Sequence, residues 1–126
     1  MLHSVSSLAP KTVVLVRHGA VNRAAGGVKP DGLYGGDVDV PLSERGEAEA
    51  CAAASYVAST YGSSVGAVFA SPMKRAVFGA ERCAEALGGT LDVKTREAFR
   101  EVKRGAWVDK TIDEVAAEFP GEDMAR

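Results

Sequence analysis

The sequence predicts an α/β fold with a mostly parallel sheet. Two short apolar runs, at residues 12–16 and 67–70, are each too short for a helix and long enough for a buried strand. Each run is followed, directly or after a loop, by a stretch with helical periodicity. Strands that alternate with helices form βαβ units, whose strands lie parallel in one sheet. We therefore expect the loops after the strands to gather at one edge of that sheet, where such folds bind ligands.

Composition predicts one soluble globular domain. The chain has 126 residues, of which 46% are hydrophobic and 25% charged, with a formal net charge of −2. The basic residues are scattered, so we expect neither a nucleic acid nor an anionic membrane as partner. No apolar stretch approaches the roughly 20 residues that span a bilayer.

The amino end and the cysteines suggest a cytoplasmic protein. Residues 1–11 lack the long apolar segment of a secretory signal, so we expect a flexible tail before a domain over 12–126. Cys51 and Cys83 each lie in an alanine-rich helical pattern, which predicts buried, reduced thiols. His3 and His18 lack the spacing of metal ligands, so no metal site is expected.

The first predicted strand, residues 12–16, ends in Arg17-His18-Gly19. An imidazole there could act as nucleophile or base, a guanidinium could hold an oxyanion, and a glycine would let a phosphate-sized group approach the backbone. The following loop, residues 19–41, is long enough to be functional or mobile, with a tight turn expected at 33–37.

The first helix is predicted over residues 44–61. Ser43 is its expected N-cap and Gly62 its end. Gly46 falls in its first turn, where a glycine suggests close packing against the preceding loop.

A second strand, residues 67–70, leads directly into a second helix. Ser71 is the expected N-cap, Pro72 the first helical residue, and Gly88-Gly89 the end after Leu87. This helix carries Arg75 in its first turn. Its predicted apolar face consists of Val77, Ala80, Ala84 and Leu87.

The remaining elements are shorter. A third strand is expected at Leu91–Val93, followed by an irregular charged stretch over residues 95–110. Thr111 to Glu114 has the pattern of a capping box, which predicts a helix that ends at Pro120-Gly121.

Two of the predicted strands thus place basic residues near their carboxyl ends. Arg17 and His18 follow the first strand, and Arg75 lies where free backbone amides also attract anions. Together they would suit a phosphoryl group, since an arginine fork can hold two oxygens at once. The alternative is that both arginines are solvated surface residues and His18 a hydrogen-bonded turn residue.

Four segments in order resemble the histidine phosphatase, or phosphoglycerate mutase-like, superfamily. The resemblance extends from about Lys11 to Asp123 and implies a three-layer α/β/α sandwich with a mostly parallel sheet, of which the carboxyl-terminal part is missing. The four segments are Leu15-Val16-Arg17-His18-Gly19, Pro41-Leu42-Ser43-Glu44-Arg45-Gly46-Glu47-Ala48, Phe69-Ala70-Ser71-Pro72-Met73-Lys74-Arg75-Ala76 and Phe99-Arg100-Glu101-Val102-Lys103-Arg104-Gly105-Ala106-Trp107.

The resemblance implies a phosphomonoester partner and a reaction without a cofactor. His18 would be phosphorylated on nitrogen while Arg17 and Arg75 hold the non-bridging oxygens. Glu101 matches the proton donor to the leaving alcohol, a role that requires a carboxyl group protonated near neutral pH. Its alternative is a solvent-facing glutamate. Weaker candidates for substrate binding, from the loop that lines the pocket in relatives, are Asn22, Tyr34 and Gly36.

The sequence also departs from the family pattern. The family has a second histidine, followed by glycine, near the carboxyl end of its domain, whereas this sequence offers only His3 besides His18. The resemblance stops at residues 119–123, where relatives continue. We therefore expect part of a larger domain, with an uncovered edge and apolar face, and weak or absent activity in this chain alone.

Within the family, the sequence favours a phosphatase, which hydrolyses phosphate monoesters. Mutases carry a serine and a Trp-Asn pair after the first motif, and Ala20-Val21-Asn22-Arg23 lacks both the serine and the tryptophan. Three alternatives stay open: a phosphoglycerate mutase-type phosphotransferase, a non-catalytic phosphate-binding fragment, and a gene fragment without a stable fold.

Overall fold

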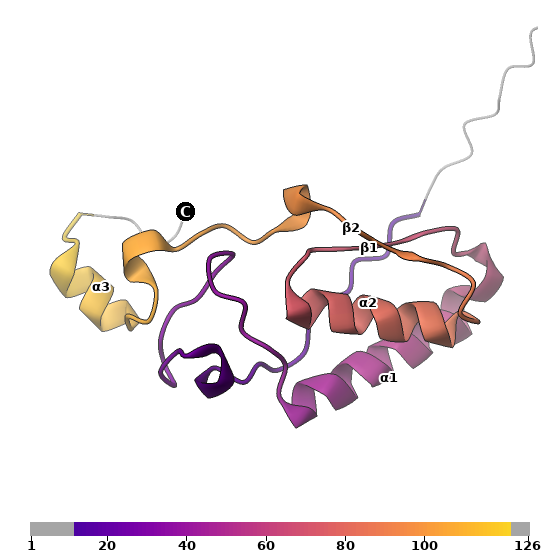
Figure 1. Ribbon diagram of the computed structural model, residues 1–126, viewed down its shortest axis with the longest axis horizontal. Helices are drawn as coiled ribbons and strands as arrows, with labels where there is room; N and C mark the ends of the chain where they lie inside the picture. Colours follow the sequence, from indigo (N-terminus) through magenta and orange to yellow (C-terminus); the bar gives the residue numbers. More distant parts are fainter. Residues whose placement is uncertain (1–11, 122–126) are drawn as a thin grey trace, which may run out of the picture.

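The structure, a computed structural model, describes residues 12–121 (Figure 1). The predicted tail at 1–11, with His3, lies outside the described residues. The long helices and the strands form one end of an elongated molecule, and a short helix with the long loop forms the other. The elements in order are α1 (Glu44–Tyr61), β1 (Val68–Ala70), α2 (Lys74–Ala86), β2 (Val93–Thr95) and α3 (Ile112–Glu118), with single 3-10 turns at Ala24–Gly26, Gly62–Ser64, Glu97–Phe99 and Gly105–Trp107.

The sheet in the described residues has two parallel strands. β1 pairs with β2 in the register Val68 to Val93, and the pairing continues through Ala70 and Thr95. The α/β class and the parallel pairing are therefore confirmed. β2 begins two residues later than predicted, because the chain first completes the turn after α2 through Gly88 and Gly89, whose φ angles are +105° and +73°.

The predicted first strand is wrong for this structure. Residues 12–16 run without a ladder partner among residues 12–121, and the side chains of Val13 and Leu15 are 77% and 90% exposed. An apolar run becomes a buried strand only where a neighbouring strand and a covering layer are present. Neither is present beside this segment in the described part of the chain, so its apolar side chains face solvent.

Both long helices lie on one side of the sheet. α2 packs against both strands and also against α1, which lies beyond it in Figure 1. Across the described residues the arrangement is therefore an open α/β unit, and the helix layer on the other face that a three-layer sandwich needs is not seen. The buried apolar residues of this unit include Ala50, Ala54, Val57, Ala70, Cys83 and Ala84.

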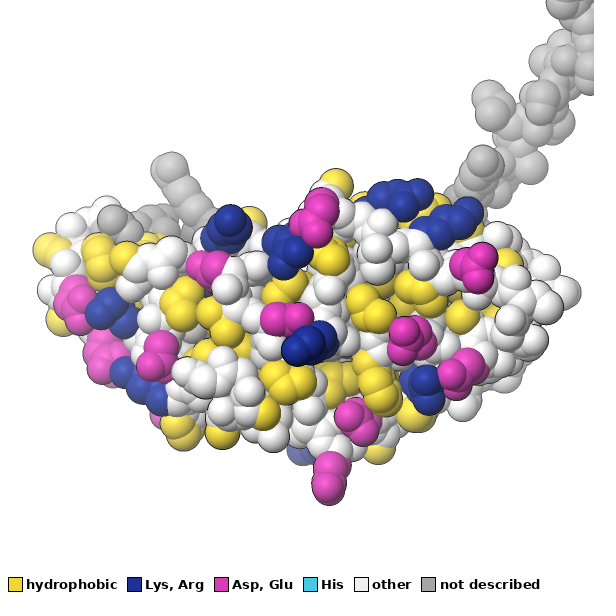
Figure 2. Space-filling view, viewed as in Figure 1, with side chains coloured by type: hydrophobic (Ala, Val, Ile, Leu, Met, Phe, Trp, Pro, Cys, Tyr) yellow, Lys and Arg dark blue, Asp and Glu magenta, His cyan; other side chains and the backbone are white. Residues whose placement is uncertain are grey.

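The sheet region carries basic side chains over an exposed aromatic ring. Phe69 of β1 is 49% exposed. Lys94 Nζ lies 5.8 Å and Arg96 Cζ 5.3 Å from the centroid of its ring. Figure 2 shows basic side chains lying over the strand region. These cations and their aliphatic stems partly cover a ring that would otherwise face water.

Two of the three predicted helix starts are confirmed. Ser43 caps α1, because its Oγ accepts the N–H of Gly46 at 3.1 Å. Thr111 and Glu114 form the capping box of α3, with reciprocal bonds of 3.2 and 2.7 Å. α1 ends at Gly62, as predicted, where φ is +45°.

The start of α2 was predicted two residues too early. Its N-cap is Met73 rather than Ser71, and Pro72 precedes the helix. Asp39, in the long loop, accepts the N–H of Lys74 at 2.9 Å. A carboxylate distant in sequence therefore satisfies the free amide that a local cap would otherwise bind, and local sequence could not show this.

The two cysteines differ in burial. Both are free, and Cys83 is buried, which raises the pKa of its thiol. Cys51, predicted to be buried, is exposed. The face of α1 that meets α2 carries Ala50 and Ala54, and Cys51 points away from it.

The start of α1 packs directly on the segment that carries His18. A Cβ on Gly46 would overlap the carbonyl oxygen of Ala20, and one on Gly19 would overlap the backbone of Gly46. The N–H of Ser43 bonds to the Ala20 carbonyl at 3.0 Å. The predicted close packing of Gly46 is thus confirmed, and the same contact explains the glycine at position 19.

We predict that Gly46→Ala lowers the free energy of unfolding by about 2 kcal/mol, because the added methyl group must push the loop off the helix. Gly79→Ala is the matched control. It lies inside α2 with no atom closer than 3.9 Å to the new Cβ, so it should stabilise the chain by about 0.5–1 kcal/mol. Urea unfolding of both variants checks this. Equal effects of the same sign would contradict the packing described.

A second prediction concerns the exposed segment. Val40 is fully buried, so Val40→Ala should cost about 2 kcal/mol of stability, whereas Leu15→Ala should change stability by less than about 0.5 kcal/mol. Thermal unfolding of the two variants measures the difference. A large loss in Leu15→Ala would show that residues 12–16 are buried in solution.

Candidate active site

His18 lies just before the start of the long loop and is half-buried. Its Nδ1 is 2.8 Å from the carbonyl oxygen of Gly19. A carbonyl oxygen only accepts, so Nδ1 carries the proton and donates it to this bond. In the neutral ring, the other nitrogen, Nε2, then holds the lone pair that a nucleophile requires.

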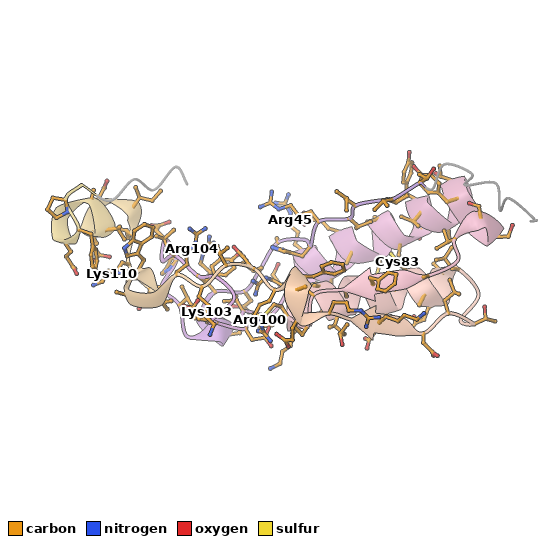
Figure 3. All side chains as sticks on the ribbon, turned by 90° about the horizontal axis from the view of Figure 1, so that it is seen from above. Arg45, Cys83, Arg100, Lys103, Arg104 and Lys110 are labelled. Atoms are coloured by element: carbon orange, nitrogen blue, oxygen red, sulfur yellow. The ribbon has the colours of Figure 1, made fainter. Side chains whose placement is uncertain are left out.

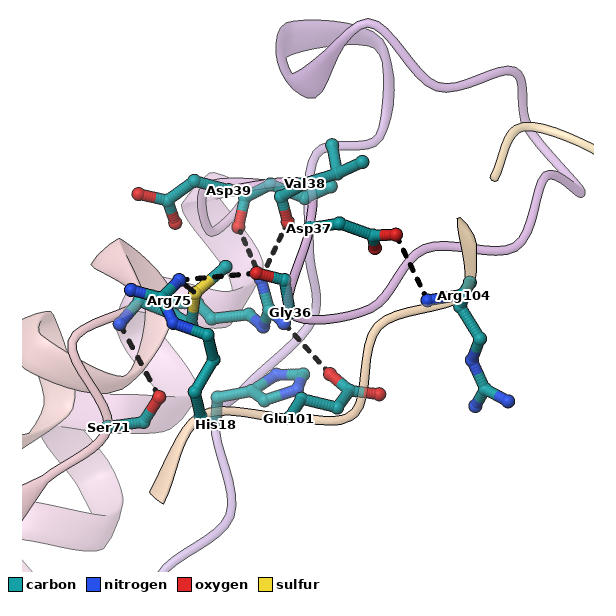
Figure 4. Close-up of polar contacts among 12 residues, drawn as sticks. His18, Gly36, Asp37, Val38, Asp39, Ser71, Arg75, Glu101 and Arg104 are labelled. Atoms are coloured by element: carbon teal, nitrogen blue, oxygen red, sulfur yellow. Dashed lines mark hydrogen bonds and ion pairs between the residues drawn. The ribbon is translucent and has the colours of Figure 1, made fainter. Parts of the chain in front are cut away.

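Arg75 is the buried cation of the site. It projects from the first turn of α2 and is 2% exposed. Its Nη2 donates to Glu101 Oε2 at 2.9 Å, and Nη1 lies 3.4 and 3.5 Å from the carbonyl oxygens of Val38 and Val40 (Figure 4). The structure therefore excludes the alternative of a solvated Arg75 and brings it together with Glu101, whose side chain is 40% exposed.

Two glycines determine where Glu101 lies. A Cβ on Gly36 would overlap the carbonyl oxygen of Glu101, and one on Gly35 would overlap that of Val102. The N–H of Gly36 donates to the Val102 carbonyl at 2.9 Å. Only glycine permits this approach of two backbones. Gly36, predicted to line the substrate pocket, thus has a definite structural task in placing Glu101.

Asp37 links the long loop to the segment that follows Glu101. It was not among the predicted site residues. Its Oδ2 accepts the N–H groups of Arg104 at 3.0 Å and Gly105 at 2.7 Å. Burial raises the pKa of this carboxyl, but these two hydrogen bonds, one from its own backbone N–H and the charge of Lys103 together lower it below the ordinary value of 3.8. The only sequence signal was its position in a glycine-rich turn.

Basic side chains gather where these segments meet. Figure 3 shows Arg100, Lys103 and Arg104 in the middle of the molecule, between the helical end and α3. Arg100 bonds to Glu97 and, through Nη1, to the carbonyl of Gly36 at 3.2 Å. The carboxylates of Glu97, Glu101 and Asp37 lie in the same region, so its charges are mixed.

Tyr34, predicted as a substrate-binding residue, contacts Arg75. Arg75 Cζ lies 5.2 Å from the centroid of the Tyr34 ring. Arg23 Cζ lies at the same distance from that centroid, and sequence reasoning did not single out Arg23. No sequence signal distinguished it, because the contact joins two parts of a loop without periodicity.

The other two predicted site residues, Arg17 and Asn22, are both exposed. Arg17 is exposed and makes no hydrogen bond or ion pair with another residue in the range 12–121. Asn22 is also exposed, and its Oδ1 accepts the N–H of Ala25 at 3.0 Å. The side-chain oxygen of Asn22 is thus occupied in the turn at 24–26.

Two further observations concern ligands. Within the described residues, no group of three or more His, Cys, Asp or Glu side chains could hold a metal ion, and no helix is both long and apolar enough to cross a membrane. An open surface depression of about 470 Å³ lies between the carboxyl-terminal half of α2 and residues 89–93, away from Arg75 at the start of this helix.

The chain matches a known protein family and a curated relative. Residues 13–126 match the model of the histidine phosphatase superfamily, branch 1. The chain is 32% identical over 114 residues to phosphoserine phosphatase 1 of Hydrogenobacter thermophilus, covering 90% of this chain and 49% of that protein.

Solved structures also resemble this chain. A mycobacterial glucosyl-3-phosphoglycerate phosphatase complexed with VO3 is 28% identical, with a TM-score of 0.66, over 86% of this chain and 49% of that one. Phosphoserine phosphatase from Entamoeba histolytica in complex with 3-phosphoglyceric acid shares the fold at 22% identity, with a TM-score of 0.61, over 85% of this chain and 45% of that one. The chain spans about half the length of these relatives.

We predict that Asp37→Asn reduces the dependence of stability on pH. A carboxyl whose pKa is lowered by folding adds stability above its ordinary value of 3.8, and this contribution is lost as the pH falls through the folded pKa. The wild type should therefore lose more stability than Asp37→Asn between about pH 5 and about pH 3.

The matched control is Asp31→Asn. Asp31 is exposed in the same loop, and its carboxylate accepts no hydrogen bond from the residues the structure describes. Urea unfolding at the two pH values should give this control the wild-type profile. Identical profiles for Asp37→Asn and the wild type would contradict the prediction.

Proposed function

The chain belongs to branch 1 of the histidine phosphatase superfamily, and we propose that it supplies the nucleophile and the phosphate-holding arginines of a phosphomonoesterase. The observation that carries the proposal is the combination of two groups. His18 leaves Nε2 free, and a buried guanidinium, Arg75, already holds a carboxylate oxygen. A phosphate oxygen presents the same charge and hydrogen-bonding pattern to that guanidinium.

The proposed reaction has two steps. In the first, Nε2 of His18 attacks phosphorus in line, a P–N bond forms, and the P–O bond to the leaving alcohol breaks. Glu101, as the carboxylic acid, gives its proton to the leaving oxygen. In the second, water attacks phosphorus, its proton passes to the Glu101 carboxylate, and the P–N bond breaks to release inorganic phosphate. Arg17 and Arg75 balance the charge on the non-bridging oxygens in both steps.

The ion pair between Arg75 and Glu101 couples binding to proton transfer. In the free chain Glu101 occupies one Nη group of Arg75, so a bound phosphate must share or take over that donor. When it does, the carboxylate lies beside a new anion, which favours its protonated form. Substrate binding would thus prepare Glu101 to act as the acid.

The relatives support a phosphatase and a small organic phosphate as substrate. Their names give phosphoserine and glucosyl-3-phosphoglycerate phosphatases, and other structures hold inorganic phosphate or 3-phosphoglyceric acid. The absence of a serine and a tryptophan from Ala20-Val21-Asn22 also favours hydrolysis over transfer to a sugar acid.

A non-catalytic phosphate-binding role is the second candidate. The exposure of residues 12–16 and of Arg17, which forms no ion pair within residues 12–121, favours it, since an arginine that is not held beside the phosphate would lower the rate before it lowers binding.

Covalent labelling tests the proposal. After incubation with a radiolabelled phosphomonoester, the chain should carry phosphate that is labile in acid and stable in alkali, and His18→Ala should carry none. Glu101→Gln should bind inorganic phosphate several-fold more tightly, because the competing charge is gone. It should acquire the label about 10²–10⁴-fold more slowly, because the acid is gone.

Calorimetry with inorganic phosphate separates the outcomes. Phosphate binding without labelling would favour the non-catalytic candidate. Alkali-labile phosphate on serine would exclude His18 as the nucleophile. A chain that neither binds phosphate nor acquires the label would contradict both candidates.

A further inference from the structure

Asp39 binds the start of the helix that carries Arg75, and its two neighbours contact the guanidinium of Arg75 (Figure 4). Oδ1 of Asp39 accepts the N–H of Lys74, the first residue of α2, at 2.9 Å. The carbonyl oxygens of Val38 and Val40, on either side of Asp39, lie 3.4 and 3.5 Å from Nη1 of Arg75. Residues 38–40 therefore contact both the head of the Arg75 side chain and the backbone one residue before it.

This short stretch of the loop is itself held in place. Val40 is fully buried, and its N–H donates to the carbonyl of Val38 at 3.1 Å. The N–H of Val38 in turn donates to the carbonyl of Gly35 at 3.3 Å. Because Asp39 lies between two residues that are held, its carboxylate reaches Lys74 from a defined point of the loop.

An ordinary helix cap is the alternative task for this carboxylate, since a cap stabilises a helix without any effect on its other side chains. Ser71 could have supplied such a cap locally, but its Oγ lies 3.5 Å from the backbone nitrogen of Met73. No ion pair joins Asp39 to another residue in the range 12–121. The cap thus comes from the same loop residues that contact the Arg75 guanidinium, which links the two contacts.

We propose that Asp39 is a positioning residue for Arg75. By binding the first amide of α2, it holds the start of this helix against the carbonyl oxygens at 38 and 40, and these orient the guanidinium for phosphate. The inference rests on the proposed function of the site beside His18. A guanidinium binds two oxygens well only in one orientation, so an arginine that is already oriented loses less entropy on binding. Asp39 acts through Arg75 and not on the substrate.

Two variants separate the hydrogen bond of Asp39 from its charge. Asp39→Asn and Asp39→Ala both remove the negative charge, which opposes an anionic ligand, but only asparagine keeps an oxygen that can accept the N–H of Lys74. Glu97 is the main cause of the raised pKa of Arg100, and the charge of Asp39 contributes less. Both variants lose that contribution alike, so a difference between them reports the hydrogen bond.

Calorimetry with inorganic phosphate makes the comparison. Asp39→Asn should bind phosphate about three- to tenfold more tightly than Asp39→Ala, as the net contribution of one hydrogen bond allows. Asp39→Ser has a shorter side chain that still offers an acceptor, and it should give an intermediate affinity. The difference between Asp39→Asn and Asp39→Ser keeps the test open if Asp39→Ala does not fold.

The cap of α3 provides the matched control, because this helix lies at the other end of the molecule (Figure 1). Thr111 Oγ1 accepts the N–H of Glu114 at 3.2 Å. Thr111→Ser keeps the hydroxyl group and Thr111→Ala removes it. In urea unfolding, the loss of the acceptor should lower stability at both positions. In calorimetry, Thr111→Ser and Thr111→Ala should bind phosphate with equal affinity.

A second measurement observes Arg75 in the absence of phosphate. NMR of the arginine side chains reports rotation about the Nε–Cζ bond, which is slow when both Nη groups are held. The Nη groups of Arg75 should exchange several-fold faster in Asp39→Ala than in Asp39→Asn. Equal exchange rates would show that Asp39 does not act through Arg75 and would overturn the inference.

The outcomes distinguish this inference from the proposed function. If Asp39→Asn and Asp39→Ala bind phosphate equally, the inference is wrong and the phosphate site stands. If the two variants at Thr111 differ in phosphate affinity as much as those at Asp39, the effect is one of helix stability, and the inference is also wrong. If the wild-type chain does not bind inorganic phosphate, the proposed function is wrong and the inference falls with it, whatever the exchange rates of Arg75.

Discussion

The ion pair between Arg75 and Glu101 is the interaction on which the arrangement of the site depends. A guanidinium that is 2% exposed is costly unless an anion and hydrogen-bond acceptors surround it. Here the anion comes from residue 101 and the acceptors from the loop around residues 38–40, while the cation comes from α2. Three segments distant in sequence must therefore assemble together before the charge of Arg75 is satisfied.

The glycines and Asp37 make that assembly possible. Gly35 and Gly36 let the loop approach the backbone at 101–102, and Asp37 binds the amides of Arg104 and Gly105. A larger side chain at either glycine would move Glu101 away from Arg75. These residues position the acid through contacts with backbone atoms, which explains why they are hard to find from chemistry alone.

His18 is held in place by different contacts from those that hold Arg75. His18 depends on the packing of the start of α1 against residues 19–20 and on its own bond to the Gly19 carbonyl. The strand expected just before it has no partner in the described residues, so Arg17 is not fixed beside Arg75. Arg75 and Glu101 are therefore held by more contacts than His18 and Arg17 are. The chain spans about half the length of its relatives.

The sequence by itself determined the helices, their local caps and the family. These features depend on neighbours within a few residues: the serine of one cap, the threonine and glutamate of the other, and the motifs around His18, Arg75 and Glu101. Only the tertiary structure decided the cap of α2 by Asp39, the role of Asp37, the contact of Arg23 with Tyr34 and the exposure of residues 12–16. Each of these depends on which distant segment lies alongside, and burial or pairing exists only where such a partner is present.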